Sequence, residues 1–189
     1  TPGPAMVLHE NIQYLKPLFF KGDDEYENIS DAVMNWIKQL SGQDEVISMQ
    51  GSATLALELA AHSFISGRVL LVSKGYYSDR LKQLLPESCL VTVCKYEDIS
   101  KITDNFDWVM CAYTEISIAF KLDLQSVKNK ADESGAKLFI DATGSIGLED
   151  DHQLADAMAF SSCRGLLGLT GASFVAYKSN LDFKNLEMF

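Results

Sequence analysis

Two short apolar runs in the C-terminal third of the chain constrain the fold most, because small and polar residues follow each of them directly. The runs are Lys137–Ile140 and Ala155–Phe160, and the residues after them are Asp141 and the turn Ser161–Arg164. Both runs have the length and composition of buried strands. Ligands of open α/β sheets bind beyond the carboxyl ends of the strands. The pattern therefore predicts that Asp141 and the turn face one pocket.

Strand-like and helix-like segments alternate along the rest of the chain. Apolar spacing and end signals predict helices at Asp31–Leu40 (capped by Ser30 or Asp31 and ended by Gly42), from Leu55 to Phe64, and at Leu122–Ser134. Further strands are predicted at Glu45–Met49, Arg68–Ser73, Leu90–Cys94, Asp107–Ala112 and Ala172–Tyr177. This alternation predicts an α/β fold, a three-layer α/β/α sandwich around a mostly parallel sheet, with residues 1–189 as a single domain.

Charge and composition exclude several classes of function. The net charge of −10 argues against nucleic acid and anionic membrane surfaces as partners, although a local pocket can still bind an anion. No apolar run is long enough to span a bilayer. Four cysteines without C-x-x-C or metal-ligand spacing are typical of reduced thiols in a cytoplasmic protein, and three separated histidines give no metal site.

The segment Gly51-Ser52-Ala53-Thr54 lies between a predicted strand and a predicted helix. The first turn of a helix has free N–H groups and the positive end of the helix dipole, so this turn can bind an anion such as phosphate. It is neither a Walker A motif nor a dinucleotide fingerprint. The alternative is that Ser52 caps the helix and that no ligand binds there.

Four motifs in order resemble the class V aminotransferases, the group that includes alanine–glyoxylate and 2-aminoethylphosphonate aminotransferases. They are the Gly51–Thr54 turn, the aromatic segment Tyr76–Arg80, the segment Tyr113–Ser117, and Asp141 followed by Ser161–Arg164. Thr1-Pro-Gly-Pro is also a common start of this family, which favours an ordered N-terminal arm. The resemblance implies the large domain of fold type I pyridoxal-phosphate (PLP) enzymes, with the family's C-terminal small domain absent, and a homodimer. It also implies transfer of an amino group from an amino compound to a 2-oxo acid.

The resemblance assigns a role to individual residues of this chain. The PLP phosphate is expected at Ser52, Ala53 and Thr54. Tyr77 would stack on the pyridine ring, Thr143 would lie on the opposite face, Ser117 would bond the ring oxygen, and Cys163 would lie beside the cofactor. Asp141 would lie beside the ring nitrogen and keep it protonated, which makes the ring an electron sink. The alternatives are a turn carboxylate for Asp141 and an ordinary loop hydroxyl for Ser117.

Arg164 stands where the family has the lysine that forms an imine with PLP. A guanidinium stays protonated in proteins and cannot form this bond, so we expect PLP to bind non-covalently and turnover to be impaired. Arg164 could instead pair with the phosphate or with a substrate carboxylate. Three hypotheses follow: an aminotransferase with its lysine replaced, a non-catalytic pseudoenzyme or partner subunit, and an α/β domain that binds another phosphorylated ligand at Gly51–Thr54.

Overall fold

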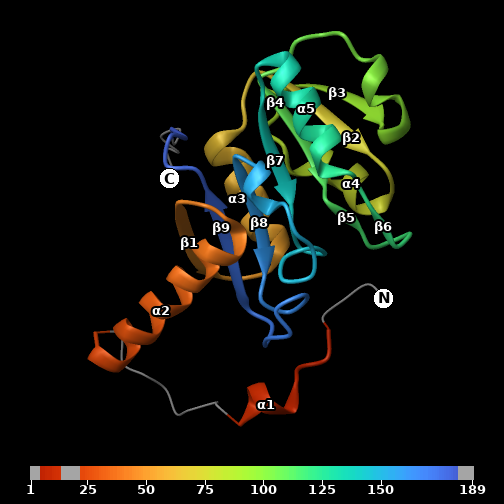
Figure 1. Cartoon of the computed structure of the whole chain (residues 1–189). Coiled ribbons are helices and arrows are strands. Elements are labelled where there is room, and N and C mark those ends of the chain that lie inside the picture. The colour runs from red at the N-terminus through yellow and green to blue at the C-terminus, as the bar shows by residue number, and fades with distance from the viewer. Residues whose placement is uncertain (1–4, 14–21, 183–189) are drawn as a thin grey trace.

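A computed structural model describes residues 5–13 and 22–182 of the chain (Figure 1). The predicted N-terminal arm, residues 1–4, lies outside the described residues. The helices are α1 (His9–Ile12), α2 (Asp24–Ser41), α3 (Ala53–Phe64), α4 (Tyr76–Arg80) and α5 (Leu124–Ser134). The strands are β1 (Glu45–Gln50), β2 (Arg68–Ser73), β3 (Leu90–Lys95), β4 (Trp108–Ala112), β5 (Thr114–Glu115), β6 (Phe120–Lys121), β7 (Lys137–Asp141), β8 (Ala157–Ser161) and β9 (Ala172–Tyr177). Three 3₁₀ turns occupy Leu81–Leu84, Tyr96–Lys101 and His152–Leu154.

Seven strands form the central sheet in the order β1-β9-β8-β7-β4-β2-β3. The five strands from β8 to β3 are parallel, whereas β9 runs antiparallel to both β8 and β1. This confirms the predicted mostly parallel sheet, and all seven predicted strands are present. Because β1 runs in the same direction as the parallel strands, the carboxyl ends of β1, β4, β7 and β8 meet at one edge of the sheet.

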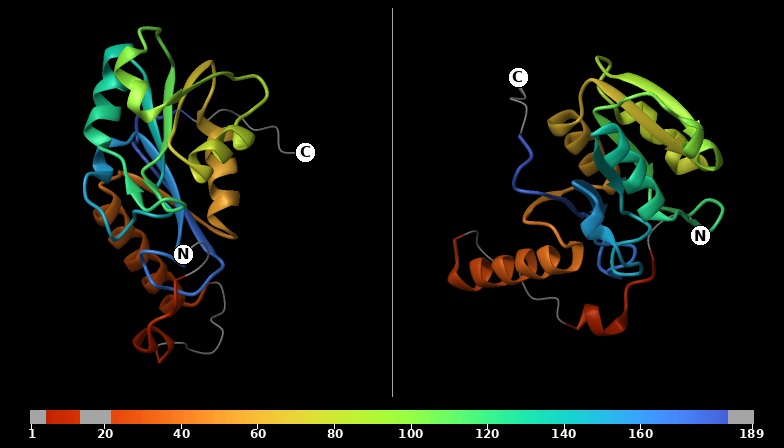
Figure 2. Two further views of the ribbon diagram at one scale, coloured as in Figure 1. Left: turned by 90° about the vertical axis from the view of Figure 1, so that its right-hand side faces the viewer. Right: turned by 45° about the horizontal axis from the view of Figure 1, so that its top comes forward.

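Helices cover both faces of the sheet, which gives the predicted three layers (Figures 1 and 2). The helix α5 and the C-terminal end of α2 pack on one face, where Ile37 and Val127 join the buried side chains of the strands. On the other face α3 packs against β8 and β9 through Ala56, Ala60 and Phe64. Alternate strand residues are buried on the two faces, as expected of a sheet with helices on both sides.

The helix predicted at Asp31–Leu40 is longer than its apolar spacing indicated. It begins at Asp24 with Asp23 as N-cap residue, so the predicted cap at Ser30 or Asp31 is wrong. The first turn is acidic, and acidic side chains stabilise the positive end of a helix without any apolar residue. The predicted end is confirmed, since Gly42 adopts a left-handed conformation with φ of 64°.

The other predicted features of the described residues can be placed briefly. None of the described helices is long and apolar enough to cross a membrane, and no group of three metal-binding side chains lies within residues 5–13 and 22–182. None of the four cysteines forms a disulfide: Cys89, Cys94 and Cys111 are buried, while Cys163 is half-buried. His152 is buried, with Nε2 2.9 Å from the hydroxyl of Ser145.

Candidate functional site

A cavity of about 500 Å³ opens at the carboxyl edge of the sheet, where β1, β4, β7 and β8 end. Segments that are far apart in the sequence line it together: Gly51–Thr54, Leu57, Tyr77, Arg80, Thr114, Ile116, Asp141, Thr143, Gly144, Ser161, Cys163, Arg164, Thr170 and Gly171. The predicted pocket shared by Asp141 and the turn 161–164 is therefore present. Eight of the nine predicted site residues line it, and Ser117 does not.

One wall of the cavity is the N-terminus of α3. The hydroxyl oxygen of Ser52 accepts the N–H of Leu55 at 3.3 Å, so Ser52 is the predicted N-cap. The N–H groups of Ala53 and Thr54 have no partner among the described residues and belong to the positive end of a 12-residue helix. The guanidinium of Arg80 adds a full charge, because its Nη2 donates to the hydroxyl of Thr54 at 3.0 Å. This wall can bind an anion.

Asp141 is a buried carboxyl group in another part of the lining, with 7% of its surface exposed. Its Oδ1 accepts the backbone N–H of Thr143 at 2.8 Å, and within the described residues it has no ion pair. Burial raises the pKa of Asp141 above its ordinary value, and the nearby charge of Glu115 adds to this rise. A cationic ligand group beside Asp141 would reverse the effect, so the lining fits a ligand with an anionic end and a protonated nitrogen.

Glu115 fixes the position of Tyr77. This carboxylate is fully buried, and it accepts the N–H of Ser78 at 2.9 Å, the hydroxyl of Ser78 at 3.0 Å and the N–H of Tyr77 at 3.3 Å. Burial alone would raise the pKa of Glu115, but these bonds and those from Ser117 outweigh it and hold the pKa below its ordinary value. Glu115 therefore ties α4 to the loop after β4 and holds the Tyr77 ring at the cavity.

Ser117 belongs to the Glu115 network and not to the cavity lining. Its hydroxyl donates to Oε1 of Glu115 at 2.5 Å and accepts the N–H of Tyr76 at 3.3 Å. Two residues nearer to β4, Thr114 and Ile116, face the cavity in its place. The loop that carries the motif does line the cavity, but the spacing of the motif alone did not show which side chains point inward.

Arg164 borders the cavity three residues after the end of β8. The following residue, Gly165, is packed so closely that a Cβ atom there would lie 1.8 Å from the backbone oxygen of Ile146. The backbone at this point is therefore fixed, and the side chain at position 164 is directed by the fold. No lysine is among the lining residues in the part of the chain that the structure describes.

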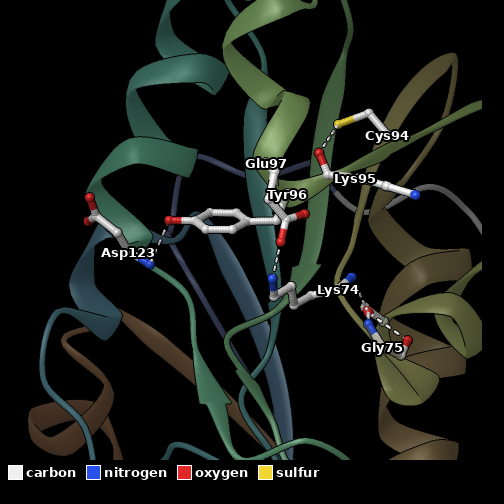
Figure 3. A network of polar contacts seen from close by, with 8 residues as sticks. Lys74, Gly75, Cys94, Lys95, Tyr96, Glu97 and Asp123 are labelled. Atoms are coloured by element: carbon white, nitrogen blue, oxygen red, sulfur yellow. Dashed lines mark hydrogen bonds and ion pairs between the residues drawn. The ribbon is translucent and has the colours of Figure 1, made fainter.

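Lys74 directly follows β2 and precedes the lining residue Tyr77 by three positions, but its ammonium group contacts residues outside the cavity lining (Figure 3). Its ammonium group pairs with Glu97 and lies 4.3 Å from the centre of the Phe120 ring. Its side chain is 17% exposed. Tyr96, which follows β3, extends the same network by accepting the N–H of Asp123 at 3.2 Å. Lys74 thus braces the strand ends beside the site.

The structure adds lining residues that the sequence reasoning did not assign to the site. Those with polar side chains are Arg80, Thr114 and Thr170. Arg80 is the last residue of the motif Tyr76–Arg80, and the resemblance gave it no role at the site. Thr114 is separated from the end of the buried strand β4 by one residue. Because ligands bind beyond strand ends, this position was the one sequence signal that Thr114 lines the site. Its hydroxyl oxygen is buried and has no hydrogen-bond partner in the described structure.

Comparison with known proteins supports the fold at low sequence identity. No protein-family model matches the chain. An uncharacterized aminotransferase of Helicobacter pylori (strain ATCC 700392 / 26695) is 21% identical over 196 residues, covering 95% of this chain and 53% of that protein. Among solved structures, the aspartate aminotransferase of subgroup IV from Thermus thermophilus superposes with a TM-score of 0.86 at 20% identity, covering 94% of this chain and 56% of that one.

A third similar protein is the pyridoxamine–pyruvate aminotransferase of Mesorhizobium loti, with a TM-score of 0.82 at 18% identity over 95% of this chain and 50% of that one. The chain spans about half the length of the relatives it matches. The matched half carries the sheet and the cavity at its carboxyl edge. The chain therefore has a class V aminotransferase-like fold, that of the large domain of fold type I PLP enzymes.

Proposed function

We propose that the cavity binds PLP or pyridoxamine phosphate without a covalent bond, and that the chain is the cofactor-binding domain of an aminotransferase-like protein. The observation that carries this proposal is the buried carboxyl group of Asp141, which has no ion pair within the described residues, in the same cavity as the N-terminus of α3. The aminotransferases named above support the choice of cofactor. The substrates would be an amino compound and a 2-oxo acid, and the assembly a homodimer.

The chain's own residues fit each part of such a cofactor. The N–H groups of Ala53 and Thr54, with the charge of Arg80, would hold the phosphate. Asp141 would accept a charge-assisted hydrogen bond from the protonated ring nitrogen, and Tyr77 offers an aromatic surface to the ring. When bound, the protonated pyridine ring supplies the electron sink for chemistry at the substrate's Cα.

Arg164 would prevent a covalent bond between the chain and the cofactor at this site. It lies at the lining where an amine would form the covalent link and move the substrate proton, and a guanidinium does neither. Its positive charge can instead attract an anionic group, such as the phosphate or a substrate carboxylate. We therefore propose that amino-group transfer is impaired in the chain as written.

A second candidate is a non-catalytic subunit that retains the cofactor site. The lining favours it, since none of the described residues at the cavity is a lysine. The two candidates differ in one property: an impaired enzyme regains covalent capture once an amine is restored at position 164, and a subunit whose site has changed further does not.

The test is to mix PLP with three forms of the chain and reduce each with borohydride. The forms are the unchanged chain, Arg164→Lys, and Arg164→Gln as a control that loses the charge without gaining an amine. Peptide mapping by mass spectrometry separates capture at position 164 from random reaction at surface lysines. We expect an adduct at position 164 only in Arg164→Lys.

Binding of pyridoxamine phosphate, which has no aldehyde, is measured in parallel by the rise in unfolding temperature. If inorganic phosphate stabilises the chain as much as pyridoxamine phosphate does, the ligand is another phosphorylated compound. If neither ligand stabilises any form and Arg164→Lys captures no PLP, the proposed function is wrong.

A further inference from the structure

The charges at the cavity form a set of two cations and one anion. Among the described residues, three acidic or basic side chains line it: Arg80, Asp141 and Arg164. Two guanidinium groups in one cavity repel each other, and a ligand relieves this repulsion when each of them contacts an anionic group. The ligand that matches the set therefore has two anionic groups and one cationic group.

Arg80 belongs to the wall that the N-terminus of α3 forms. Its Nη2 donates to the hydroxyl oxygen of Thr54 at 3.0 Å. The helix itself packs in the buried cluster that contains Ala56 and Phe64, on one face of the sheet. This wall is where the proposed function places the phosphate, so Arg80 is the cation for the phosphate.

The backbone next to Arg164 is held on the other face of the sheet. A Cβ atom at Gly165 would lie 1.8 Å from the backbone oxygen of Ile146. Ile146 is part of the buried cluster beneath α5 and the C-terminal end of α2, and Leu166 packs against the same cluster. The chain that follows Arg164 is therefore anchored opposite α3, and Arg164 enters the cavity from a different wall than Arg80 does.

We infer that Arg164 binds a carboxylate that the ligand carries in addition to its phosphate, so that the site prefers a cofactor with an α-amino acid attached to the bare cofactor. This inference rests on the proposed function. A guanidinium holds a carboxylate through two parallel hydrogen bonds, a geometry that a lysine cannot offer. The cavity of about 500 Å³ is of the size that takes a small organic ligand rather than a phosphate alone.

The competing arrangement has both guanidinium groups on the phosphate. The N–H groups of Ala53 and Thr54 and the charge of Arg80 already provide for that group. If Arg164 bound the phosphate as well, no other basic side chain among the described lining residues would be left for a carboxylate. An anionic group placed in the cavity without a cation would be unfavourable. The two arrangements therefore differ in how the site responds to a carboxylate on the ligand.

Three probes isolate that response. They are pyridoxamine phosphate, N-phosphopyridoxyl-L-alanine, and N-phosphopyridoxyl-ethylamine, which matches the alanine compound except that it lacks the carboxylate. None of them has an aldehyde, so binding is measured without covalent reaction. The readouts are the dissociation constant of each probe from isothermal titration and the unfolding temperature of each form of the chain without ligand.

The forms compared are the unchanged chain, Arg164→Gln, Arg164→Lys and Arg80→Gln. We expect the unchanged chain to bind the alanine compound about 10- to 100-fold more tightly than the ethylamine compound, the effect of hydrogen bonds between charged groups. Arg164→Gln should lose this preference and still bind the ethylamine compound and pyridoxamine phosphate within about threefold of the unchanged chain. Arg164→Lys should keep a smaller preference, because it retains the charge without the paired bonds.

Arg80→Gln is the matched control, since it removes the other guanidinium of the cavity. It should weaken all three probes by one common factor and leave the preference for the carboxylate intact. A merely structural role of Arg164 would instead weaken the three probes together and lower the unfolding temperature.

Two results would overturn the inference and leave the cofactor site standing. One is an unchanged chain that binds the alanine and ethylamine compounds equally well. The other is an equal loss for all three probes in Arg164→Gln, which would assign Arg164 to the phosphate or to the fold. If Arg164→Gln does not fold, Arg164→Lys decides, and a preference as large as that of the unchanged chain contradicts the inference. If the unchanged chain binds none of the three probes, the proposed function fails together with it.

Discussion

Glu115 and Asp141 are two buried carboxyl groups at the same edge of the sheet, and their surroundings are opposite. Glu115 accepts hydrogen bonds from Tyr77, Ser78 and Ser117, and its pKa lies below its ordinary value. Asp141 accepts the backbone N–H of Thr143, faces a cavity, and has a raised pKa. The first is satisfied by the protein itself and holds the site in shape. Asp141 is satisfied only in part, as expected of a carboxyl group that binds a ligand in the proposed function.

The largest effect that this comparison predicts is on stability. Glu115→Gln keeps the shape but replaces one acceptor oxygen with an amide that donates, directly opposite the N–H donors of α4. We expect the free energy of unfolding to fall by about 3 kcal/mol, the range for a broken buried network. Urea denaturation at neutral pH measures it. A loss no greater than that of Asp141→Asn would remove the distinction between the two groups.

Asp141→Asn should have its main effect on the ligand. The amide oxygen can still accept the N–H of Thr143, so we expect the free energy of unfolding to change by less than about 1 kcal/mol. Binding of pyridoxamine phosphate should weaken about 10- to 100-fold, because a hydrogen bond between charged groups is lost. Isothermal titration with Asp141→Asn and the unchanged chain measures this ratio, and equal affinities would contradict the role given to Asp141.

The two carboxyl groups should also make stability depend on pH in opposite directions. The raised pKa of Asp141 means that the folded chain binds its proton more tightly than the unfolded chain. Its contribution is therefore most favourable below the unfolded value of about 3.9 and is lost as pH rises through the folded value. The lowered pKa of Glu115 gives stability that is present above about 4.3 and is lost as pH falls through the folded value.

Denaturation of the unchanged chain and Asp141→Asn across pH 3 to 8 isolates the first of these contributions. The stability of the unchanged chain relative to Asp141→Asn should decrease as pH rises from about 4. A difference that is independent of pH would show that Asp141 titrates as an ordinary exposed carboxyl group.

The smallest predicted effect concerns the loop that Glu115 organises. Ala119 has a φ of 53°, a left-handed conformation that costs a residue with a Cβ atom about 1 kcal/mol relative to glycine. Ala119→Gly should raise the free energy of unfolding by about 0.5 kcal/mol, because the greater freedom of glycine in the unfolded chain offsets part of the gain. Thermal unfolding with Ala32→Gly on the exposed side of α2 as control, where destabilisation by about 1 kcal/mol is expected, checks the sign.

The sequence predicted the sheet well because each strand carries its own evidence. Buried apolar runs such as Arg68–Ser73 and Ala172–Tyr177 have turn residues at both ends, and both were placed at their observed bounds. The start of α2 was missed because its first turns are stabilised by acidic residues at the helix N-terminus, and apolar spacing does not detect that contribution.

The cavity lining was predicted where a side chain stands at a strand end or shortly after it, as for Asp141 and Arg164. It was not predicted in the loop after β4, where direction depends on which hydroxyl the buried Glu115 engages. The bonds of Ser117 to Glu115 and the exposure of Thr114 and Ile116 to the cavity are long-range results of folding. The spacing of residues in a motif does not contain that information.

The most direct test of this account is the unfolding temperature of the unchanged chain with and without saturating pyridoxamine phosphate, measured beside Asp141→Asn. The account predicts a clear rise for the unchanged chain, several degrees larger than the rise from the same concentration of inorganic phosphate, and a much smaller rise for Asp141→Asn. Equal shifts for pyridoxamine phosphate and phosphate in both forms would contradict it, because the cavity would then recognise the anion alone and Asp141 would have no ligand.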